Sequence, residues 1–162
     1  MIRWARLSPC GNYRYELGRA WGEGPQVLWV MVNPSTADAD VDDATIRRCI
    51  GFSRGWGFGS LAVVNLFAYR STDPKALKTV TDPIGGPTNV DAILNQMDCA
   101  RLVVAAWGSN AANAKRPLLP IDALAHAARV PLRCLGRSKS GAPNHPLYLA
   151  ANTPLEPYGA FE

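Results

Sequence analysis

The chain has 162 residues, 48% of them hydrophobic, and a formal net charge of +4. This size and composition fit one globular domain, and we take residues 1–162 as that domain. No apolar run reaches the roughly 18–20 residues that cross a bilayer, and the first residues lack the apolar core of a signal peptide. The sequence therefore argues against a membrane protein and predicts a cytoplasmic one.

The four cysteines lie far apart, and none belongs to a C-x-x-C pair. Such spacing favours neither a zinc site nor a disulfide framework, so we expect no metal and no cofactor. Cys49, Cys99 and Cys134 lie in or beside apolar stretches, which is typical of small buried side chains.

Strand and helix patterns alternate along the chain. Residues 13–18 alternate in polarity and predict an edge strand. The apolar runs at 27–32, 60–67, 102–107 and 131–135 predict buried strands. Residues 136–162 are rich in glycine, proline and small side chains and are expected to form loops.

Helical patterns fill the gaps between these strands. One begins at Asp43 and ends at Gly55, and its apolar face carries Ile46, Cys49 and Ile50. A short helix is expected from Pro74, and residues 89–97 predict a helix that turns Ile93, Leu94 and Met97 inward. Residues 110–129 are helical too, but Pro117 and Pro120 break the middle of that segment.

This alternation predicts an α/β fold: a three-layer α/β/α sandwich around a largely parallel sheet of four or five strands. Right-handed crossovers place the carboxyl ends of the parallel strands at one edge of the sheet. Ligands of such sheets bind at that edge.

Polar residues follow each predicted strand and should meet at this edge. The predicted substrate-binding residues are Pro34, Ser35, Asn65, Arg70, Trp107, Ser109 and Asn144. Simpler explanations exist for several of them: Asn33-Pro34-Ser35 can be a turn, Trp107 a core residue, and Asp42 or Asp43 a helix N-cap. Asn65 interrupts an apolar strand and needs a partner, either a ligand or a neighbouring backbone group.

Residues 101–140 are strongly basic, with seven Arg and Lys residues and the single acid Asp122. This charge suggests a nucleic acid or nucleotide partner, although an uneven solvated surface would look the same. The oligomeric state does not follow from the sequence.

Five blocks occur in order: VMVNPSTAD, DDATIRRC, VVNLFAYRST, AAWG and GAPNHPLYL. Together they resemble a family of prokaryotic and phage proteins known as domain of unknown function 1643, over roughly residues 10–150. This resemblance implies no established activity.

The blocks are also similar to the uracil-DNA glycosylase superfamily. VLWVMVNPS resembles the strand and G-x-[DN]-P loop that holds the hydrolytic water there. AVVNLFAYRST is similar to the strand that ends in a base-reading asparagine, LVVAAWGSNA to a later W-G-x-x-A strand, and GAPNHPLYL to the H-P-S loop whose histidine contacts the base. Met31 replaces the glycine of the first motif. Leu147 replaces the serine of the last, which weakens the expectation of contacts to the DNA backbone.

These residues suggest cleavage of an N-glycosidic bond in DNA or a nucleotide. His145 can donate to the departing base, Asn65 can read its Watson–Crick edge, and Asn33 can orient water. Because an amide is a poor base, cleavage should depend either on dissociation of the base as an anion or on a carboxylate, for which Asp38, Asp42 and Asp43 are the candidates. We predict Asn33, His145 and Asp43 as catalytic residues. The alternative is a nucleotide or nucleic-acid binding module without chemistry.

Overall fold

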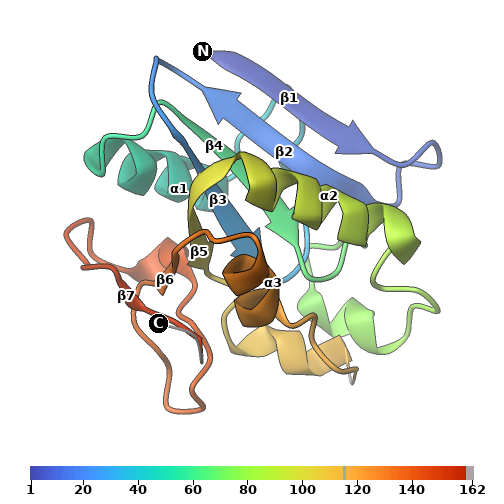
Figure 1. The fold of residues 1–162 in the computed structure, drawn as a ribbon. Coiled ribbons are helices and arrows are strands. Elements are labelled where there is room, and N and C mark those ends of the chain that lie inside the picture. Colours follow the sequence, from blue (N-terminus) through green and yellow to red (C-terminus); the bar gives the residue numbers. More distant parts are fainter. Residues whose placement is uncertain (115, 160–162) are drawn as a thin grey trace.

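A computed structural model of the protein describes residues 1–114 and 116–159. Within them the strands are β1 (Ile2–Leu7), β2 (Arg14–Ala20), β3 (Gln26–Met31), β4 (Ser60–Asn65), β5 (Ala100–Ala105), β6 (Leu132–Cys134) and β7 (Glu156–Pro157). The α-helices are α1 (Ala44–Gly55), α2 (Gly86–Cys99) and α3 (Ile121–Ala127), and three short 3₁₀ helices are η1 (Pro74–Lys78), η2 (Ser109–Ala114) and η3 (Pro146–Tyr148). Figure 1 shows their arrangement.

The strands form one sheet in the order β1-β2-β4-β3-β5-β6-β7. The inner strands β4, β3, β5 and β6 run parallel, whereas β1, β2 and β7 are antiparallel to their neighbours. The α/β class and the parallel centre are confirmed. The sheet is mixed and has seven strands, so the prediction of four or five largely parallel strands is wrong at the two edges.

The missed edge strands carry weak sequence signals. In β1 every residue is exposed or half-buried, so it lacks an apolar run, and β7 has only two residues. As a result β2 is not the edge strand that residues 13–18 predict, because β1 covers its outer side. The Trp4 ring of β1 lies so close to Gly18 of β2 that a Cβ atom there would come within 1.9 Å of it.

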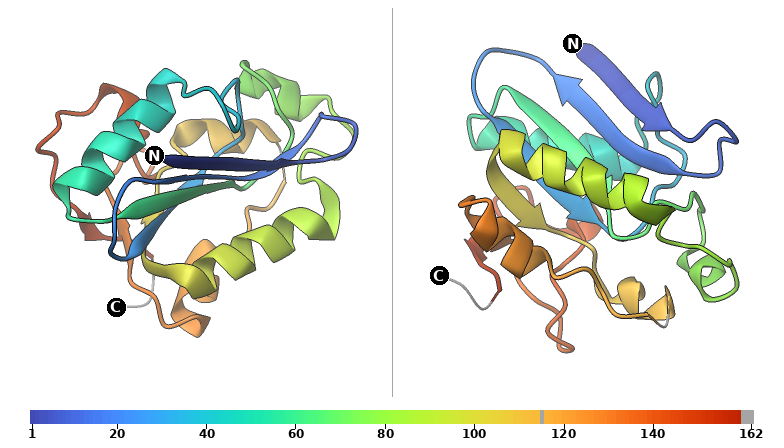
Figure 2. Two further views of the ribbon diagram at one scale, coloured as in Figure 1. Left: turned by 90° about the horizontal axis from the view of Figure 1, so that it is seen from above. Right: turned by 45° about the vertical axis from the view of Figure 1, so that its right-hand side comes forward.

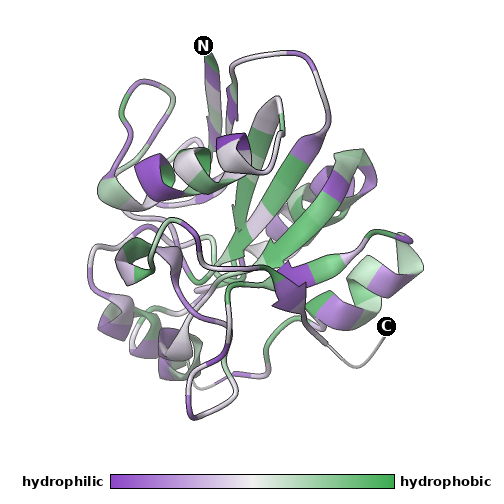
Figure 3. Cartoon of the chain, turned by 90° about the vertical axis from the view of Figure 1, so that its left-hand side faces the viewer, coloured by the Kyte–Doolittle hydropathy of each residue, from purple (hydrophilic) through white to green (hydrophobic). Residues whose placement is uncertain are grey.

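The inner strands are apolar on both faces because helices cover both (Figures 2 and 3). Along β3, Val27, Trp29 and Met31 pack on the α1 side, while Leu28 and Val30 pack on the side of α2 and α3. Burial of both faces turns the usual alternation of polar and apolar residues into one continuous apolar run.

Helix α1 begins where the sequence predicts, because the Asp43 carboxylate accepts a hydrogen bond from the Ile46 backbone N–H at 2.9 Å. Helix α2 starts at Gly86, earlier than predicted, with Pro87 in its first turn. The inward orientation predicted for Leu94 is wrong: the residue is 38% exposed. The buried face of α2 instead runs through Asn89, Ala92, Ile93 and Met97.

The segment 110–129 is split as its prolines require. Residues Ser109–Ala114 form η2, and Pro120 directly precedes α3. Lys115 lies outside the described residues. Along the chain, β3 connects to β4, β4 to β5 and β5 to β6 through a helix. These four strands run parallel, so their carboxyl ends meet at one edge.

Candidate functional site

A pocket of about 560 Å³ opens at the carboxyl edge of the inner strands. Its size is in the range of small-molecule sites, roughly 300–1,000 Å³. Eight of the predicted site residues line it: Asn33, Ser35, Asp43, Asn65, Trp107, Ser109, Asn144 and His145. The parallel topology therefore brings together loops that are more than a hundred residues apart in sequence.

Pro34 and Arg70 do not line the pocket. Pro34 is buried, and its carbonyl accepts hydrogen bonds from Asn33 Nδ2 and from the Ser71 backbone. Arg70 points its Nη1 to the Gly11 carbonyl at 3.3 Å. Both residues support the loops around the pocket, and their role in substrate binding stays a prediction.

Asn65 ends β4 and is 1% exposed. Neither Oδ1 nor Nδ2 of its side chain has a hydrogen-bond partner among the residues that the structure describes. Its backbone is satisfied by the protein, since the carbonyl accepts from Asn89 Nδ2 at 3.0 Å. A buried amide without partners costs roughly 1–3 kcal/mol, so the fold holds here a group that only a ligand or water in the pocket can satisfy.

His145 lies on the loop that follows β6 and caps η3. Its Nδ1 accepts a hydrogen bond from the Leu147 backbone N–H at 3.3 Å, so the proton of the neutral ring is on Nε2. Burial lowers the pKa of His145 below its usual 6.5, and the Asp43 carboxylate opposes this shift. The pocket thus contains a neutral imidazole whose remaining nitrogen is a hydrogen-bond donor.

This pKa shift predicts a stability effect in acid. Below about pH 6.5 the unfolded chain binds a proton at His145 more readily than the folded protein does. The free energy of unfolding should therefore fall as the pH drops through that value. In His145→Asn the asparagine still offers Leu147 an acceptor but does not titrate. Urea unfolding at pH 7.5 and pH 5 should therefore show a smaller decrease in the free energy of unfolding at pH 5 for the variant than for the parent. An equal loss in both proteins would contradict the prediction.

Arg48 of α1 holds the histidine loop in place. Its Nη2 donates to the Leu149 carbonyl and its Nε to the Pro146 carbonyl at 3.4 Å. The guanidinium also lies over the Phe52 ring, 5.0 Å from the centroid. Helix α1 therefore carries Asp43 at its start and anchors His145 from its second turn.

Arg48→Met should release this loop while keeping the contact with Phe52. We expect the free energy of unfolding to fall by about 1–2 kcal/mol, and amide hydrogen exchange to accelerate at His145 and at residues 147–149. The matched control is Arg47→Met, because Arg47 is an exposed neighbour that donates to the Asp42 carbonyl. Similar exchange of the loop in the two variants would show that Arg48 does not hold it.

Asn33 lines the pocket, and its side-chain amide is held by the surrounding loops. Its Nδ2 donates to the carbonyls of Ser71 at 3.0 Å and Pro34 at 3.2 Å, which sets the orientation of the amide. Oδ1 has no partner in the described part of the chain. This oxygen can accept a hydrogen bond from water but cannot take up a proton effectively.

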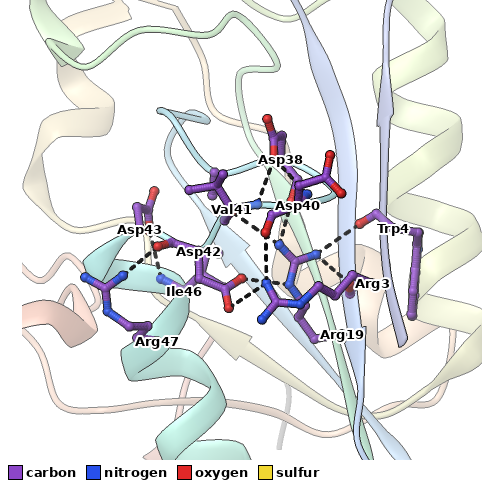
Figure 4. Close-up of polar contacts among 12 residues, drawn as sticks. Arg3, Trp4, Arg19, Asp38, Asp40, Val41, Asp42, Asp43, Ile46 and Arg47 are labelled. Carbon is purple, nitrogen blue, oxygen red and sulfur yellow. Dashed lines mark hydrogen bonds and ion pairs between the residues drawn. The ribbon is translucent and has the colours of Figure 1, made fainter. Parts of the chain in front are cut away.

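The structure distinguishes among the three candidate carboxylates. Asp42 is paired with Arg19 at 2.8 Å and with Arg3 at 3.0 Å. The Asp38 carboxylate accepts from the backbone N–H groups of Asp40 and Val41. Figure 4 shows this network between β1, β2 and the loop before α1. Of these three residues, only Asp43 lines the pocket.

Trp107 and Asn144 are held by the protein. Trp107 is 6% exposed and packs edge-on against Tyr158, so it is part of the core as well as of the pocket wall. Asn144 donates to the Leu135 carbonyl at 3.1 Å. Gly108 beside them has φ +67°, and a Cβ there would lie 3.5 Å from the Cβ of His145. A side chain at this position would strain the backbone next to the histidine.

Arg14 is a pocket residue that the sequence analysis did not identify. It is 2% exposed, and its Nη1 donates to the Ala37 carbonyl at 2.6 Å. Burial lowers the pKa of its guanidinium to about 10, and Asp43 opposes that shift. The group is therefore charged at neutral pH. The sequence offered one signal for this residue, namely an arginine inside the strand predicted at residues 13–18.

The basic stretch 101–140 does not gather at the pocket. Arg101 and Arg129 lie near the amino ends of β5 and β6, whereas Arg137 and Lys139 follow the carboxyl end of β6. None of the basic residues described in this stretch lines the pocket, and Lys115 lies outside the described residues. The charge is spread over both ends of the sheet, because the stretch runs across it.

A family model described as "Protein of unknown function (DUF1643)" matches residues 14–147. The chain belongs to this family. In the DUF1643 chain the matched range begins at Arg14 and includes His145, while Tyr148 at the pocket rim falls outside it. No curated protein and no solved structure matches the chain. The family description states no activity.

Among residues 1–114 and 116–159, no group of three or more His, Cys, Asp or Glu side chains is placed to hold a metal ion. In the same part of the chain, no helix is both long and apolar enough to cross a membrane.

Proposed function

We propose that the pocket binds a nucleobase and hydrolyses its N-glycosidic bond in a nucleotide or in DNA. The observation that carries this proposal is the unpaired, buried amide of Asn65 in the pocket. An amide presents one acceptor and two donors side by side, which complements the alternating carbonyl and N–H groups of a base edge. Binding a base would satisfy both atoms that the fold leaves unpaired.

His145 supports a role in bond cleavage as well as binding. The departing base takes the electron pair of the bond to the sugar, so negative charge develops on its ring and carbonyl oxygens. A neutral imidazole that donates from Nε2 can stabilise this charge. Its Nδ1 is already engaged by Leu147, so Nε2 is the donor that remains for a ligand.

Asp43 and Asn33 provide a place for the attacking water. Asp43 Oδ1 accepts from Ile46, and its second carboxylate oxygen has no hydrogen-bond donor in the described residues. In the proposed step, Asn33 Oδ1 orients the water and Asp43 takes its proton. The water oxygen bonds to the anomeric carbon while the carbon–nitrogen bond breaks and the base leaves as an anion. Asp43 also favours the positive charge that develops on the sugar.

The motif resemblance to the uracil-DNA glycosylase superfamily adds support at the corresponding positions, Asn33, Asn65 and His145. Leu147 stands where that superfamily has the serine of the H-P-S loop, and this difference affects the expected contacts to the DNA backbone. For this reason the proposal includes free nucleotides as substrates alongside DNA.

The test is incubation with free nucleotides and with single- and double-stranded DNAs that contain deaminated or modified bases. Mass spectrometry would measure the released base and the abasic product, with the His145→Asn protein beside the parent. We expect release by the parent and at least a tenfold loss in the variant. Tight binding without base release by either protein would indicate a nucleotide-binding module in place of an enzyme. The absence of both binding and release would contradict the proposal.

A further inference from the structure

Arg14 and Arg19 lie on the same strand, β2, and are both buried, but their surroundings differ. Arg19 is 0% exposed and pairs with Asp42, and its guanidinium donates further to the carbonyls of Gly18 and Asp38. Its charge is thus neutralised and its donors are used inside the protein. Arg19 is explained by the structure of the loop that it holds (Figure 4).

Arg14 lacks such compensation. No carboxylate lies within ion-pair distance of it among the described residues, and Asp43 and Asp38 act on it only through longer-range attraction. Of its guanidinium nitrogens, only Nη1 has an acceptor among the described residues, the Ala37 carbonyl. Its Nε is buried without a partner. A buried charge without a counterion is unfavourable, because it has lost its hydration without a full replacement.

The free side of the guanidinium has a definite chemical preference. With Nη1 engaged, Nε and Nη2 form the edge that remains, and this edge matches two oxygens of a carboxylate or phosphate in a bidentate pair. Arg14 lines the same pocket as Asn65. One ligand can therefore satisfy an unpaired amide and an unpaired guanidinium together.

We propose that Arg14 forms an oxyanion subsite, so that the ligand of this pocket is an acidic nucleobase compound that carries a phosphate or a carboxylate group. The inference rests on the proposed function for the nucleobase part alone. It narrows the substrate class to charged compounds, and it assigns Arg14 to ligand binding. Neutral bases and nucleosides should be poor ligands.

Isothermal titration calorimetry on the full chain tests this with matched pairs of probes. One set compares the common nucleosides with their 5′-monophosphates, and a second compares uracil with uracil 6-carboxylate. A charged member should bind at least about tenfold more tightly than its neutral partner. A preference in the first set identifies phosphate as the oxyanion, and a preference in the second identifies carboxylate. Equal binding within every pair, or no binding of any charged probe, would overturn the proposal.

Variants locate the effect at Arg14. Arg14→Met should abolish the preference for the charged member, and Arg14→Lys should retain part of it, since lysine keeps the charge without the bidentate geometry. Arg6→Met is the matched control, because Arg6 lies on β1 near Glu16 and away from the pocket. A preference that survives in Arg14→Met would place the oxyanion elsewhere. If Arg14→Met does not fold, the comparison of charged and neutral probes on the parent protein still tests whether the pocket prefers an oxyanion.

This result is separable from that of the proposed function. Base release from neutral nucleosides as fast as from nucleotides would remove the oxyanion subsite and leave the glycosylase proposal intact. Charge-selective binding without any base release would support the oxyanion subsite and remove the glycosylase proposal.

Discussion

Asn65→Val should yield a protein that is more stable than the parent and unable to bind a nucleobase. The substitution removes two buried polar atoms that have no partners in the described structure and suits a strand in position and shape. Relief of the desolvation cost should raise the free energy of unfolding by about 1 kcal/mol. Chemical denaturation would measure the stability, and calorimetry with the nucleotide that binds the parent most tightly would measure the affinity, which we expect to fall at least a hundredfold.

Asn89→Ala is the matched control for this prediction. Asn89 is also a fully buried asparagine whose Oδ1 has no partner in the described residues, but it belongs to α2, lies outside the pocket and donates from Nδ2 to the Asn65 carbonyl. Its loss should lower stability by about 1 kcal/mol and leave the affinity within a fewfold of the parent. A destabilised Asn65→Val protein that still binds would mean that Asn65 is a structural residue.

Asp43→Asn should reduce base release by about a hundredfold or more, the range attributed to a general base, with little change in stability. Asparagine caps helices as well as aspartate does, so the hydrogen bond from Ile46 at the start of α1 can persist. The amide, however, cannot accept the proton of the attacking water. Single-turnover measurement of released base, beside thermal unfolding, separates the two roles.

Two further variants complete this comparison. Asp43→Ala removes both cap and carboxylate and should also cost about 1 kcal/mol of stability. Asp73→Asn alters another capping aspartate, which accepts from Lys75 at the start of η1 and lies outside the pocket. Base release should stay unchanged in it. Full activity in Asp43→Asn would exclude Asp43 as the base of the proposed reaction.

Several parts of this protein follow from local sequence. Apolar runs and helical periodicity are short-range properties, and they indicate the inner strands, α1 and the edge at which their loops meet. The helix start at Asp43 follows from the chemistry of one side chain and the next backbone turn. The prolines at 117 and 120 likewise interrupt the helical pattern of their own segment.

The contents of the pocket depend on tertiary structure. Three of its features arise from residues that are distant in sequence. The Asn65 side chain is left unpaired, Asp42 is neutralised by Arg3 and Arg19, and Arg14 has no counterion. The edge strands β1 and β7 are likewise defined by pairing, since backbone hydrogen bonds to a neighbour do not require an apolar run. Sequence alone thus determines where the loops converge, because periodicity is local. Which polar groups remain free for a ligand is decided only by the folded chain, because hydrogen-bond satisfaction is set by neighbours in space.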